Sequence, residues 1–405
     1  MTRSSIRRAC ASTLAIVAFV APAINGQALE LPAPRGPYAL GTTILHWVDA
    51  ARAETSRGHE RERRELMVQL WYPAAPSTLS FVPYVPEFTA IAAHAKELNA
   101  HGLALLGGGI NRLRDVRAHA RLDAPVLATG SPWPVVLFSP GNSVPRSIYT
   151  VLVEDLASRG FVVAAIDHPY TVAIVVLPGG RVAMQDPDEP GASFEARVAV
   201  RAADLRFALD EITRANAADG GAFAGRLDLS HVGAFGHSLG GVAAVQIAAS
   251  DRRFTAVANL DGGTGEIADN IERNRVTPLL LVTKSTAAES APTDQTLKTW
   301  GLSRTQYEAL MAEERRQREA TYGAMTSVAY RITVAGAQHM NFSDAPYLER
   351  DNRGIDAVRA LRITSDYLAA FFERFLYERP SVLLDGPSSA HPEICPSISR
   401  GASWA

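Results

Sequence analysis

The feature that most constrains the fold of this chain is one short run, Gly236-His237-Ser238-Leu239-Gly240-Gly241. The strand-like residues 231–235 lead into it, and the small apolar residues 242–249 follow it with the character of a helix. Glycine at positions 236 and 240 removes Cβ atoms where a strand and a helix would crowd together. The run therefore predicts a strand, a sharp turn and a helix, with Ser238 at the tip of the turn.

Gly-x-Ser-x-Gly in a strand–turn–helix setting is typical of the nucleophile elbow of the α/β-hydrolase fold. The helix behind the turn directs its N-terminal N–H groups at negative charge that develops beside the serine. Ser238 is therefore the predicted nucleophile.

The rest of the chain alternates between strand and helix patterns, which predicts a parallel sheet covered on both faces. Strands are predicted at residues 36–49, 65–72, 134–138, 161–166, 256–260, 278–282 and 328–334. Helices are predicted at residues 146–159, 194–217 and 356–376, and a hairpin at residues 171–185. The predicted class is α/β, specifically an α/β-hydrolase fold with a mostly parallel central sheet, helices on both faces and two helical insertions.

Residues 29–380 are predicted to form one catalytic domain. Its first insertion, at about 73–134, is rich in proline at its ends, helical in its middle and without a predicted strand, so we expect it to pack over one end of the sheet. The second, at about 285–327, contains a helix that begins at the capping box Ser303-Arg304-Thr305-Gln306. Residues 381–405 are predicted to form a loosely held C-terminal tail.

The first 28 residues have the pattern of a signal peptide. The apolar stretch 11–23 is too short to span a bilayer, and it follows three arginines, Arg3, Arg7 and Arg8. Ala23 and Ala28 are the two candidate cleavage positions. We expect the mature protein to be exported, periplasmic or secreted, by the general or the twin-arginine route.

Composition excludes several classes of partner. The 405 residues carry a formal charge of −2, which gives no basis for binding nucleic acid or an anionic membrane surface. No stretch after the signal peptide predicts a membrane span. The two cysteines, Cys10 and Cys395, lack the spacing of metal ligands and cannot form a disulfide within the mature protein. We therefore expect neither a metal nor a cofactor.

A serine hydroxyl is a weak nucleophile that needs a general base, and the base needs an orienting carboxylate. In α/β-hydrolases these residues come in the chain order Ser, Asp or Glu, His. His339 closely follows the predicted final strand, residues 328–334, and is the candidate base. The other histidines lie elsewhere, and His168, after an earlier strand, is interpreted as part of a turn.

The orienting acid usually follows the strand before the second insertion. Here the predicted strand 278–282 leads into residues 283–286, which contain no carboxylate. One strand earlier, residues 256–260 end in Asp261-Gly262-Gly263. Active sites of open α/β sheets form at the carboxyl ends of strands, so Asp261 is the candidate acid, with Glu289 and Asp294 as alternatives.

An oxyanion hole requires N–H donors, one directly after the nucleophile and one from the loop after an early strand. The first is the N–H of Leu239. In the loop at residues 138–143, Gly141 permits a tight turn and Pro140 has no N–H to donate. The N–H of Asn142 is therefore the predicted second donor.

Several runs resemble a known family: Gly36-Pro37-Tyr38, Trp71-Tyr72-Pro73, Phe138-Ser139-x-Gly141, residues 155–165, the elbow, Leu260-Asp261 and His339-x-Asn341-Phe342-Ser343-Asp344. The chain resembles the platelet-activating-factor acetylhydrolase family of α/β-hydrolases, the plasma and type II enzymes and their bacterial relatives, from about Gly36 to Tyr377. The family places its catalytic acid soon after the serine, and the 23 residues from Ser238 to Asp261 look like that spacing. This chain departs from the family pattern at Pro140, where the family has histidine.

The resemblance implies a secreted serine ester hydrolase that cleaves short acyl groups through an acyl-enzyme, with Ser238, Asp261 and His339 as its triad. The implied substrate is a small ester or an oxidised or short-chain phospholipid. A broad-specificity carboxylesterase or polyester hydrolase is the alternative among enzymes, whereas a dienelactone-type hydrolase would have cysteine in place of Ser238. The alternative of another class is a non-catalytic ligand-binding protein on a hydrolase scaffold, which would be expected to lack a triad member.

Overall fold

The structure, a computed structural model, describes residues 29–100, 109–128, 131–185, 193–263, 277–285, 293–299, 301–309, 311–313, 316, 328–351 and 353–398. The predicted signal peptide, residues 1–28, lies outside the described residues. So do Glu289 and much of the second predicted insertion. The capping box of that insertion is present, because Ser303 N–H donates to Gln306 Oε1 at 2.8 Å and Gln306 N–H donates to Ser303 Oγ at 3.2 Å.

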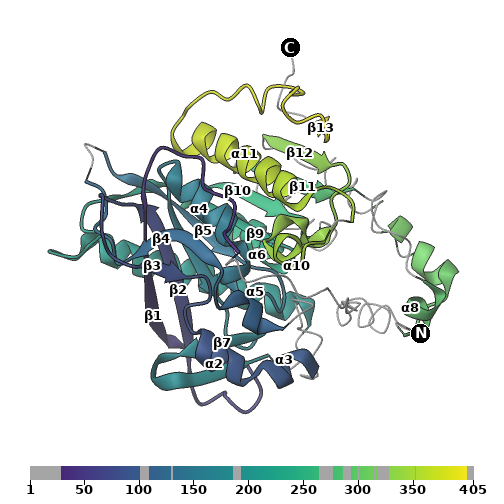
Figure 1. Ribbon diagram of the computed structural model, residues 1–405, viewed down its shortest axis with the longest axis horizontal. Helices are drawn as coiled ribbons and strands as arrows, with labels where there is room; N and C mark the ends of the chain where they lie inside the picture. The colour runs from purple at the N-terminus through teal and green to yellow at the C-terminus, as the bar shows by residue number, and fades with distance from the viewer. Residues whose placement is uncertain are drawn as a thin grey trace.

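An eleven-stranded sheet forms the centre of the molecule, in the order β13-β12-β11-β10-β9-β5-β6-β2-β1-β4-β3 (Figure 1). The six neighbouring strands from β12 to β6 are parallel, and antiparallel pairs lie towards both edges. The strands are β1 (Leu40–Ala53), β2 (Arg63–Pro73), β3 (Phe81–Pro83), β4 (Arg117–Leu122), β5 (Trp133–Ser139), β6 (Val162–Asp167), β9 (Leu227–His237), β10 (Phe254–Leu260), β11 (Leu279–Lys284), β12 (Ala329–Val334) and β13 (Ile394–Ile398). The mostly parallel sheet expected from the sequence is confirmed.

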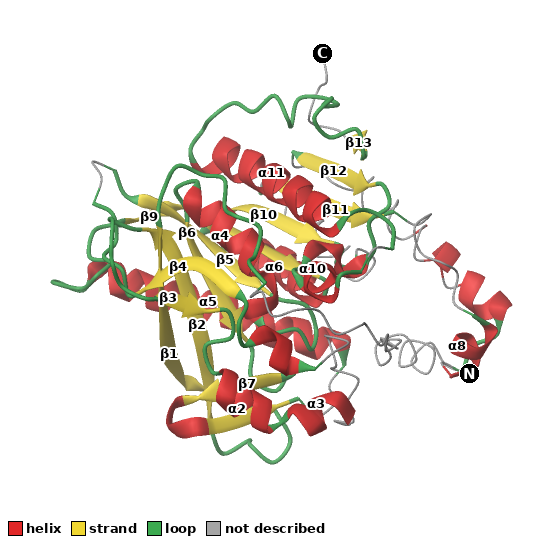
Figure 2. Cartoon of the chain, in the orientation of Figure 1, coloured by secondary structure: helices red, strands yellow, loops and turns green. Residues whose placement is uncertain are grey.

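Helices cover both faces of this sheet (Figure 2). Helices α4 (Thr150–Ser158) and α11 (Ala357–Leu376) pack on one face, and α5 (Phe194–Ala217) and α6 (Leu239–Ser250) pack on the other. The two faces share the central strands in alternation, as Phe138 of β5 faces α4 and α11 while Leu137 faces α5 and α6. The predicted layers are therefore confirmed, with a core on each side of the sheet.

The remaining elements are short. The predicted hairpin is present as β7 (Ile174–Leu177) and β8 (Arg181–Met184), which turn through the 3-10 segment Pro178–Gly180. Further helices among the described residues include α2 (Phe88–Ala93), α3 (Ala95–Ala100), α8 (Asp294–Thr299) and α10 (Ala345–Glu349), and further 3-10 segments include η1 (Ile110–Leu113), η2 (Arg146–Tyr149) and η4 (His339–Phe342).

The expectation that the first insertion has no strand is wrong. Strands β3 and β4 lie within residues 73–134 and extend the sheet past β1, with β4 parallel to β1. The buried positions of β4 are Ala118 and Ala120, between arginines. Alanine gives only a weak apolar alternation, so this strand forms through its pairing with β1 and not through its own hydrophobic pattern.

The C-terminal segment is also more ordered than expected. Strand β13 pairs antiparallel with β12 and covers the edge of the sheet. Arg359 of α11 holds the same segment through an ion pair with Glu393 at 2.7 Å. The run contains Pro396, which argues against a strand in a sequence but is compatible with an edge strand.

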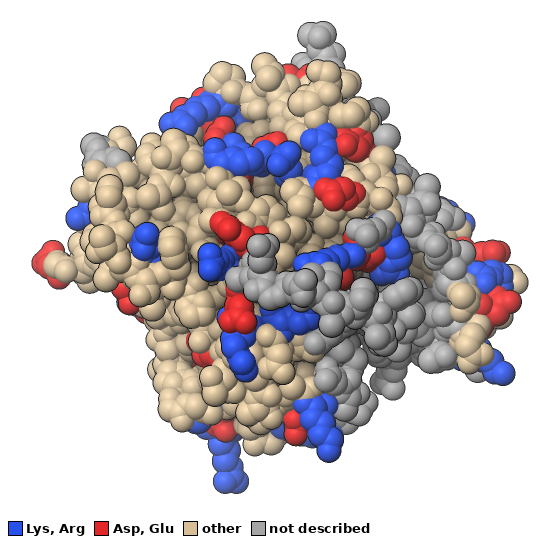
Figure 3. Space-filling view, in the orientation of Figure 1, with Lys and Arg blue, Asp and Glu red and all other residues tan. Residues whose placement is uncertain are grey.

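Basic and acidic side chains are interspersed on the face shown in Figure 3. Within the described part of the chain, no helix combines the length and the apolar character that a membrane-spanning helix requires.

Candidate active site

Ser238 forms the turn between β9 and α6, and its backbone is strained. Its φ of 54° and ψ of −123° lie outside the regions that non-glycine residues prefer. Such strain costs on the order of 1–3 kcal/mol. Ser238 N–H donates to the Leu260 carbonyl at 2.8 Å, which holds the turn against β10. Ser238 is partly exposed whereas residues 232–237 and 239 are buried, so the turn brings this serine to the surface of the sheet edge.

Each elbow glycine stands where a side chain would collide with backbone. A Cβ on Gly236 would lie 2.3 Å from the carbonyl carbon of Gly240, and a Cβ on Gly240 would lie 2.0 Å from the carbonyl oxygen of Ser139. The first approach closes the elbow itself. The second brings the start of α6 against the segment after β5, residues 139–144, which we call the 139–144 loop.

His339 and Asp261 lie in direct contact. The Nδ1 atom of His339 is 2.6 Å from Oδ2 of Asp261. Asp261 follows β10 directly, and His339 begins η4 in the loop after β12. A reciprocal capping interaction between Gln338 and Asn341 fixes η4, and with it the orientation of the imidazole.

The carboxylate of Asp261 is held ionised. Burial by itself would raise its pKa, but the hydrogen bond and charge of His339 and the charge of Lys284 outweigh burial and lower the pKa. Lys284 N–H also donates to Oδ1 of Asp261 at 3.1 Å. An ionised carboxylate can only accept, so His339 Nδ1 carries the proton and Nε2 remains available as a base.

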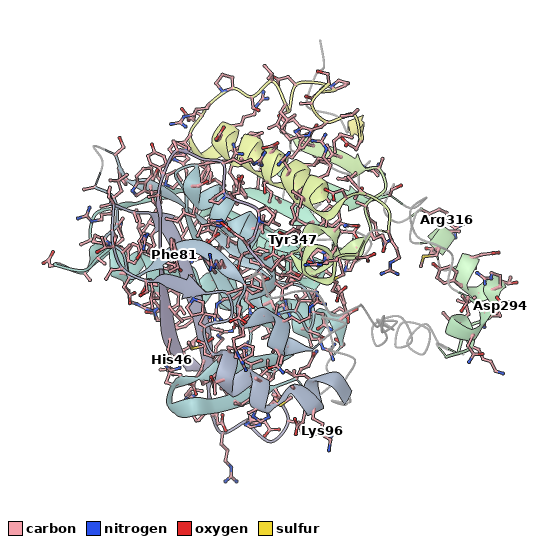
Figure 4. All side chains as sticks on the ribbon, viewed as in Figure 1. His46, Phe81, Lys96, Asp294, Arg316 and Tyr347 are labelled. Atoms are coloured by element: carbon pink, nitrogen blue, oxygen red, sulfur yellow. The ribbon has the colours of Figure 1, made fainter. Side chains whose placement is uncertain are left out.

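Three further contacts place His339 beside the elbow. His237 Nε2 lies 2.9 Å from the His339 carbonyl, the two imidazole rings are 4.5 Å apart, and Ser238 N–H is bonded to the residue before Asp261. Ser238, Asp261 and His339 therefore lie just after the carboxyl ends of β9, β10 and β12, with His339 in contact with Asp261 and with His237, the residue before Ser238. The alternative acid Asp294 lies in α8, where it pairs with Arg304 at 2.6 Å, far from these strand ends (Figure 4).

Among residues 140–144, one N–H group has no acceptor in the described part of the chain, that of Asn142. Pro140 has none to give. The others are occupied: Gly141 donates to the Tyr149 hydroxyl at 3.1 Å, Ser143 to the Thr171 carbonyl at 3.1 Å and Val144 to the Gly141 carbonyl at 3.2 Å. Leu239 is the first residue of α6, so its N–H lies in the helical turn whose amides have no partner within the helix. The two predicted donors are thus amides for which the described residues provide no acceptor.

The groups brought together suit covalent acid–base catalysis: a serine on a strained turn, a histidine with one free nitrogen, an ionised carboxylate and two open amides. Among the described residues, no cluster of three or more His, Cys, Asp or Glu side chains has an arrangement that could hold a metal ion.

Comparison with known proteins gives the family of this chain. The sequence matches the profile of the family described as platelet-activating factor acetylhydrolase, isoform II, over residues 23–189 and 212–358. The chain belongs to this family. It is therefore a carboxylic ester hydrolase, as the elbow and the family resemblance predicted.

Individual relatives extend over nearly the whole chain. A probable 1-alkyl-2-acetylglycerophosphocholine esterase of Arthroderma benhamiae is 26% identical, across 94% of this chain and 97% of the relative. The platelet-activating factor acetylhydrolase of Gallus gallus is 21% identical, across 88% of this chain and 87% of the relative. The solved structure of a ferulic acid esterase from Streptomyces cinnamoneus superposes with a TM-score of 0.70 at 34% identity, across 91% of this chain and 99% of that one. This neighbour confirms the α/β-hydrolase fold.

In this acetylhydrolase-family chain, Tyr149 and His237 connect the two sides of the site, and neither has a role predicted from the sequence. Gly141 N–H donates to the Tyr149 hydroxyl. The same hydroxyl lies 2.8 Å from Nδ1 of His237. The other ring nitrogen of His237, Nε2, faces the His339 carbonyl. A carbonyl can only accept, so Nε2 carries the proton and the Tyr149 hydroxyl donates to Nδ1. Burial and the neighbouring His339 lower the pKa of His237 to about 3, so its ring is neutral. The chain gives no local signal for this contact, since Tyr149 and His237 are 88 positions apart.

A second Ser–His–Asp arrangement consists of Ser139, His168 and Asp204. His168 is 2.9 Å from Ser139 Oγ through Nε2 and 2.8 Å from Asp204 Oδ2 through Nδ1. All three residues are 0% exposed, so no substrate can reach them. Arg64 binds the same Asp204 carboxylate at 2.6 and 3.1 Å. His168 also closes the predicted turn, because its carbonyl accepts from two following amides. The sequence does carry a signal for Asp204, because a charged residue on the buried, apolar face of a helix indicates a buried polar interaction.

Buried neutral histidine makes stability depend on pH. Burial lowers the pKa of His168 to about 4, whereas an unfolded histidine titrates near about 6.5. As pH falls, His168 therefore takes up a proton in the unfolded chain before it does so in the folded protein. The stability that neutral His168 contributes to the folded protein is present above about pH 6.5 and is lost as pH falls towards 4. Between pH 7 and pH 5 the loss from His168 amounts to about 2 kcal/mol of unfolding free energy.

The expected result is a difference between variants, because carboxyls with raised pKa values, such as the half-buried Glu349 and the buried Asp344, act in the opposite sense. Urea unfolding at pH 7 and pH 5 should show a pH-dependent loss smaller by about 2 kcal/mol in His168→Asn than in the wild type. His231→Asn, at an exposed histidine, is the matched control and should follow the wild type. Equal losses in His168→Asn and the wild type would contradict a buried, neutral His168.

Proposed function

We propose that this chain hydrolyses short-acyl carboxylic esters by nucleophilic catalysis, with Ser238 as nucleophile, His339 as general base and Asp261 as the orienting acid. The observation that carries the proposal is the 2.6 Å contact between His339 Nδ1 and Asp261, at the same sheet edge as the strained Ser238. This contact selects the imidazole tautomer that can accept a proton at Nε2.

In the first half of the reaction, Ser238 Oγ attacks the ester carbonyl carbon while its proton passes to Nε2 of His339. Asp261 stabilises the imidazolium that forms. The carbonyl oxygen becomes an oxyanion and accepts hydrogen bonds from the N–H groups of Leu239 and Asn142, with support from the N-terminus of α6. The tetrahedral intermediate then releases the alcohol, which takes the proton from His339 and leaves an acyl-enzyme.

In the second half, water replaces the alcohol. His339 removes a proton from the water, whose oxygen attacks the acyl carbon, and the same two amides hold the second oxyanion. Collapse of this intermediate returns the proton to Ser238 and releases the carboxylic acid. The neutral ring of His237 takes no part in these transfers, because both of its nitrogens are engaged.

The substrate class we propose is an ester of a short acyl group, on a small alcohol or on a phospholipid. The similarity to the Arthroderma benhamiae protein, a probable esterase of 1-alkyl-2-acetylglycerophosphocholine, supports it. A broad carboxylesterase is the second candidate, because the solved structure at 34% identity is described as a ferulic acid esterase.

The test is a series of p-nitrophenyl esters of rising acyl length, together with 1-alkyl-2-acetylglycerophosphocholine and ethyl ferulate. A confined acyl pocket predicts a kcat/KM that falls steeply beyond short acyl groups, by about tenfold for every 1.4 kcal/mol of lost transition-state binding. Efficient cleavage of ethyl ferulate and of long acyl chains would favour the broad carboxylesterase. Binding of esters without turnover of any of them would favour a ligand-binding scaffold.

We further infer that residues 1–28 form a signal peptide and that the mature enzyme is exported. The arginine-rich start and the short apolar stretch 11–23 support this inference. N-terminal sequencing of the exported protein would find the cut after Ala23 or Ala28, and an uncut, retained chain would contradict it.

A further inference from the structure

Two charged residues of α5, one helical turn apart, hold the 139–144 loop. Arg201 is 0% exposed and donates to three main-chain carbonyls, those of Pro140, Gly141 at 3.3 Å and Thr171 at 2.9 Å. Asp204 reaches Ser139, the first residue of the loop, through His168. Pro140 and Gly141 are thus bound directly to this helix, and Ser139 is connected to it through His168.

The contact with Gly141 determines where the next amide points. The Gly141 carbonyl and the Asn142 N–H belong to one trans peptide unit, so they point in opposite directions. The carbonyl accepts from Arg201 and from Val144 N–H at 3.2 Å, on the buried side of the loop. The Asn142 N–H therefore points away from α5, to the side where it has no acceptor among the described residues. A half-turn of this peptide would break both bonds and present a carbonyl in place of the donor.

We propose that Arg201 is a positioning residue that aims the Asn142 N–H into the oxyanion hole. This inference rests on the proposed function and assigns a role to a residue that would touch neither the substrate nor the triad. Tyr149 completes the arrangement, because its hydroxyl occupies the neighbouring Gly141 N–H and leaves Asn142 as the loop's donor.

The chemistry at Arg201 suits positioning better than stability. Burial lowers the pKa of its guanidinium to about 9, which shows how unfavourable its surroundings are for a charge. Its three hydrogen bonds all go to carbonyls, and Nε has no partner among the described residues. The carboxylate one turn along, Asp204, is already bound by Arg64. Burying a cation that is paired only with carbonyl groups carries a large desolvation penalty, so it contributes little to the stability of a fold. The planar guanidinium can, however, orient several carbonyls at once.

The test compares Arg201→Met and Arg201→Lys with the wild type on p-nitrophenyl acetate and on a trifluoromethyl ketone, which forms a tetrahedral adduct with a catalytic serine. Loss of one oxyanion donor lowers kcat by about 100- to 1000-fold, and misdirection of one donor should cost about 10- to 100-fold. Arg201→Met should therefore lose kcat with little change in KM, and lose trifluoromethyl ketone affinity by a similar factor. Arg201→Lys can keep one carbonyl contact and should recover part of both losses.

Leu209→Ala is the matched control, since Leu209 is a buried residue of the same helix, two turns further from the loop. It should lower the unfolding temperature while retaining kcat and ketone affinity. Wild-type kcat and affinity in a folded Arg201→Met would overturn the inference. If that variant does not fold, Arg201→Lys decides: a wild-type kcat and affinity overturn the inference, and a parallel loss of both supports it. Absence of turnover by the wild type would instead overturn the proposed function.

Discussion

Replacing Ser238 by alanine is expected to lower kcat for p-nitrophenyl acetate by between about 10⁴- and 10⁶-fold, with little loss of stability. The variant lacks the atom that would bond to the acyl carbon, so no acyl-enzyme can form. The proposed oxyanion donors, the N–H groups of Leu239 and Asn142, remain and are expected to stabilise attack by water, which sets the residual rate. The measurement is the initial rate, together with the burst of p-nitrophenol that an acyl-enzyme produces.

The second Ser–His–Asp arrangement supplies the control. Ser139 is fully buried, so Ser139→Ala should lose less than about tenfold, the worth of one hydrogen bond to the loop. If Ser238→Ala keeps its activity, or Ser139→Ala loses all of it, Ser238 is the wrong assignment for the nucleophile.

Asp261→Asn is expected to lower kcat by about a thousandfold or more while leaving the fold intact. The amide of asparagine can donate to Nδ1 of His339 where the carboxylate accepts, which favours the tautomer with the proton on Nε2. That tautomer cannot remove the proton of Ser238. The charge that stabilises the imidazolium is lost as well. Acylation should slow with KM nearly unchanged, as measured by single-turnover kinetics.

Asp294→Asn is the matched control for this prediction. Asp294 is the acid that a conventional position in the chain would favour, and it is an exposed residue paired with Arg304. Its variant should retain wild-type rates. Full activity in Asp261→Asn combined with loss in Asp294→Asn would reverse the assignment that the contact with His339 supports.

The sequence predicted most of the fold because its central elements carry their signals locally. Helix α5 was placed at residues 194–217, and the structure has Phe194–Ala217, capped by Ser193. The parallel strands read as buried apolar runs, and the elbow glycines marked the turn before Ser238. Strands β4 and β13 were missed because alternating alanines and an edge proline carry little local signal, and their partners β1 and β12 lie elsewhere in the chain.

Prediction of the site was likewise limited to features that are encoded locally in the chain. Chain order, strand ends and glycines were enough to propose Ser238, Asp261, His339, Leu239 and Asn142 as its residues. They were not enough to relate Tyr149 to His237, or Arg201 to the 139–144 loop, because those contacts join segments tens of residues apart.

The sequence by itself determined the backbone of this protein's central elements: where strands end, where the elbow bends and which side chains stand at those ends. The tertiary structure alone decided which of those side chains meet, which tautomer of His339 the Asp261 carboxylate selects, and which amide of the 139–144 loop remains open. The physical reason is that local backbone preferences act between near neighbours in the chain. Hydrogen-bond pairing in a buried site instead depends on which distant groups packing brings within about 3 Å.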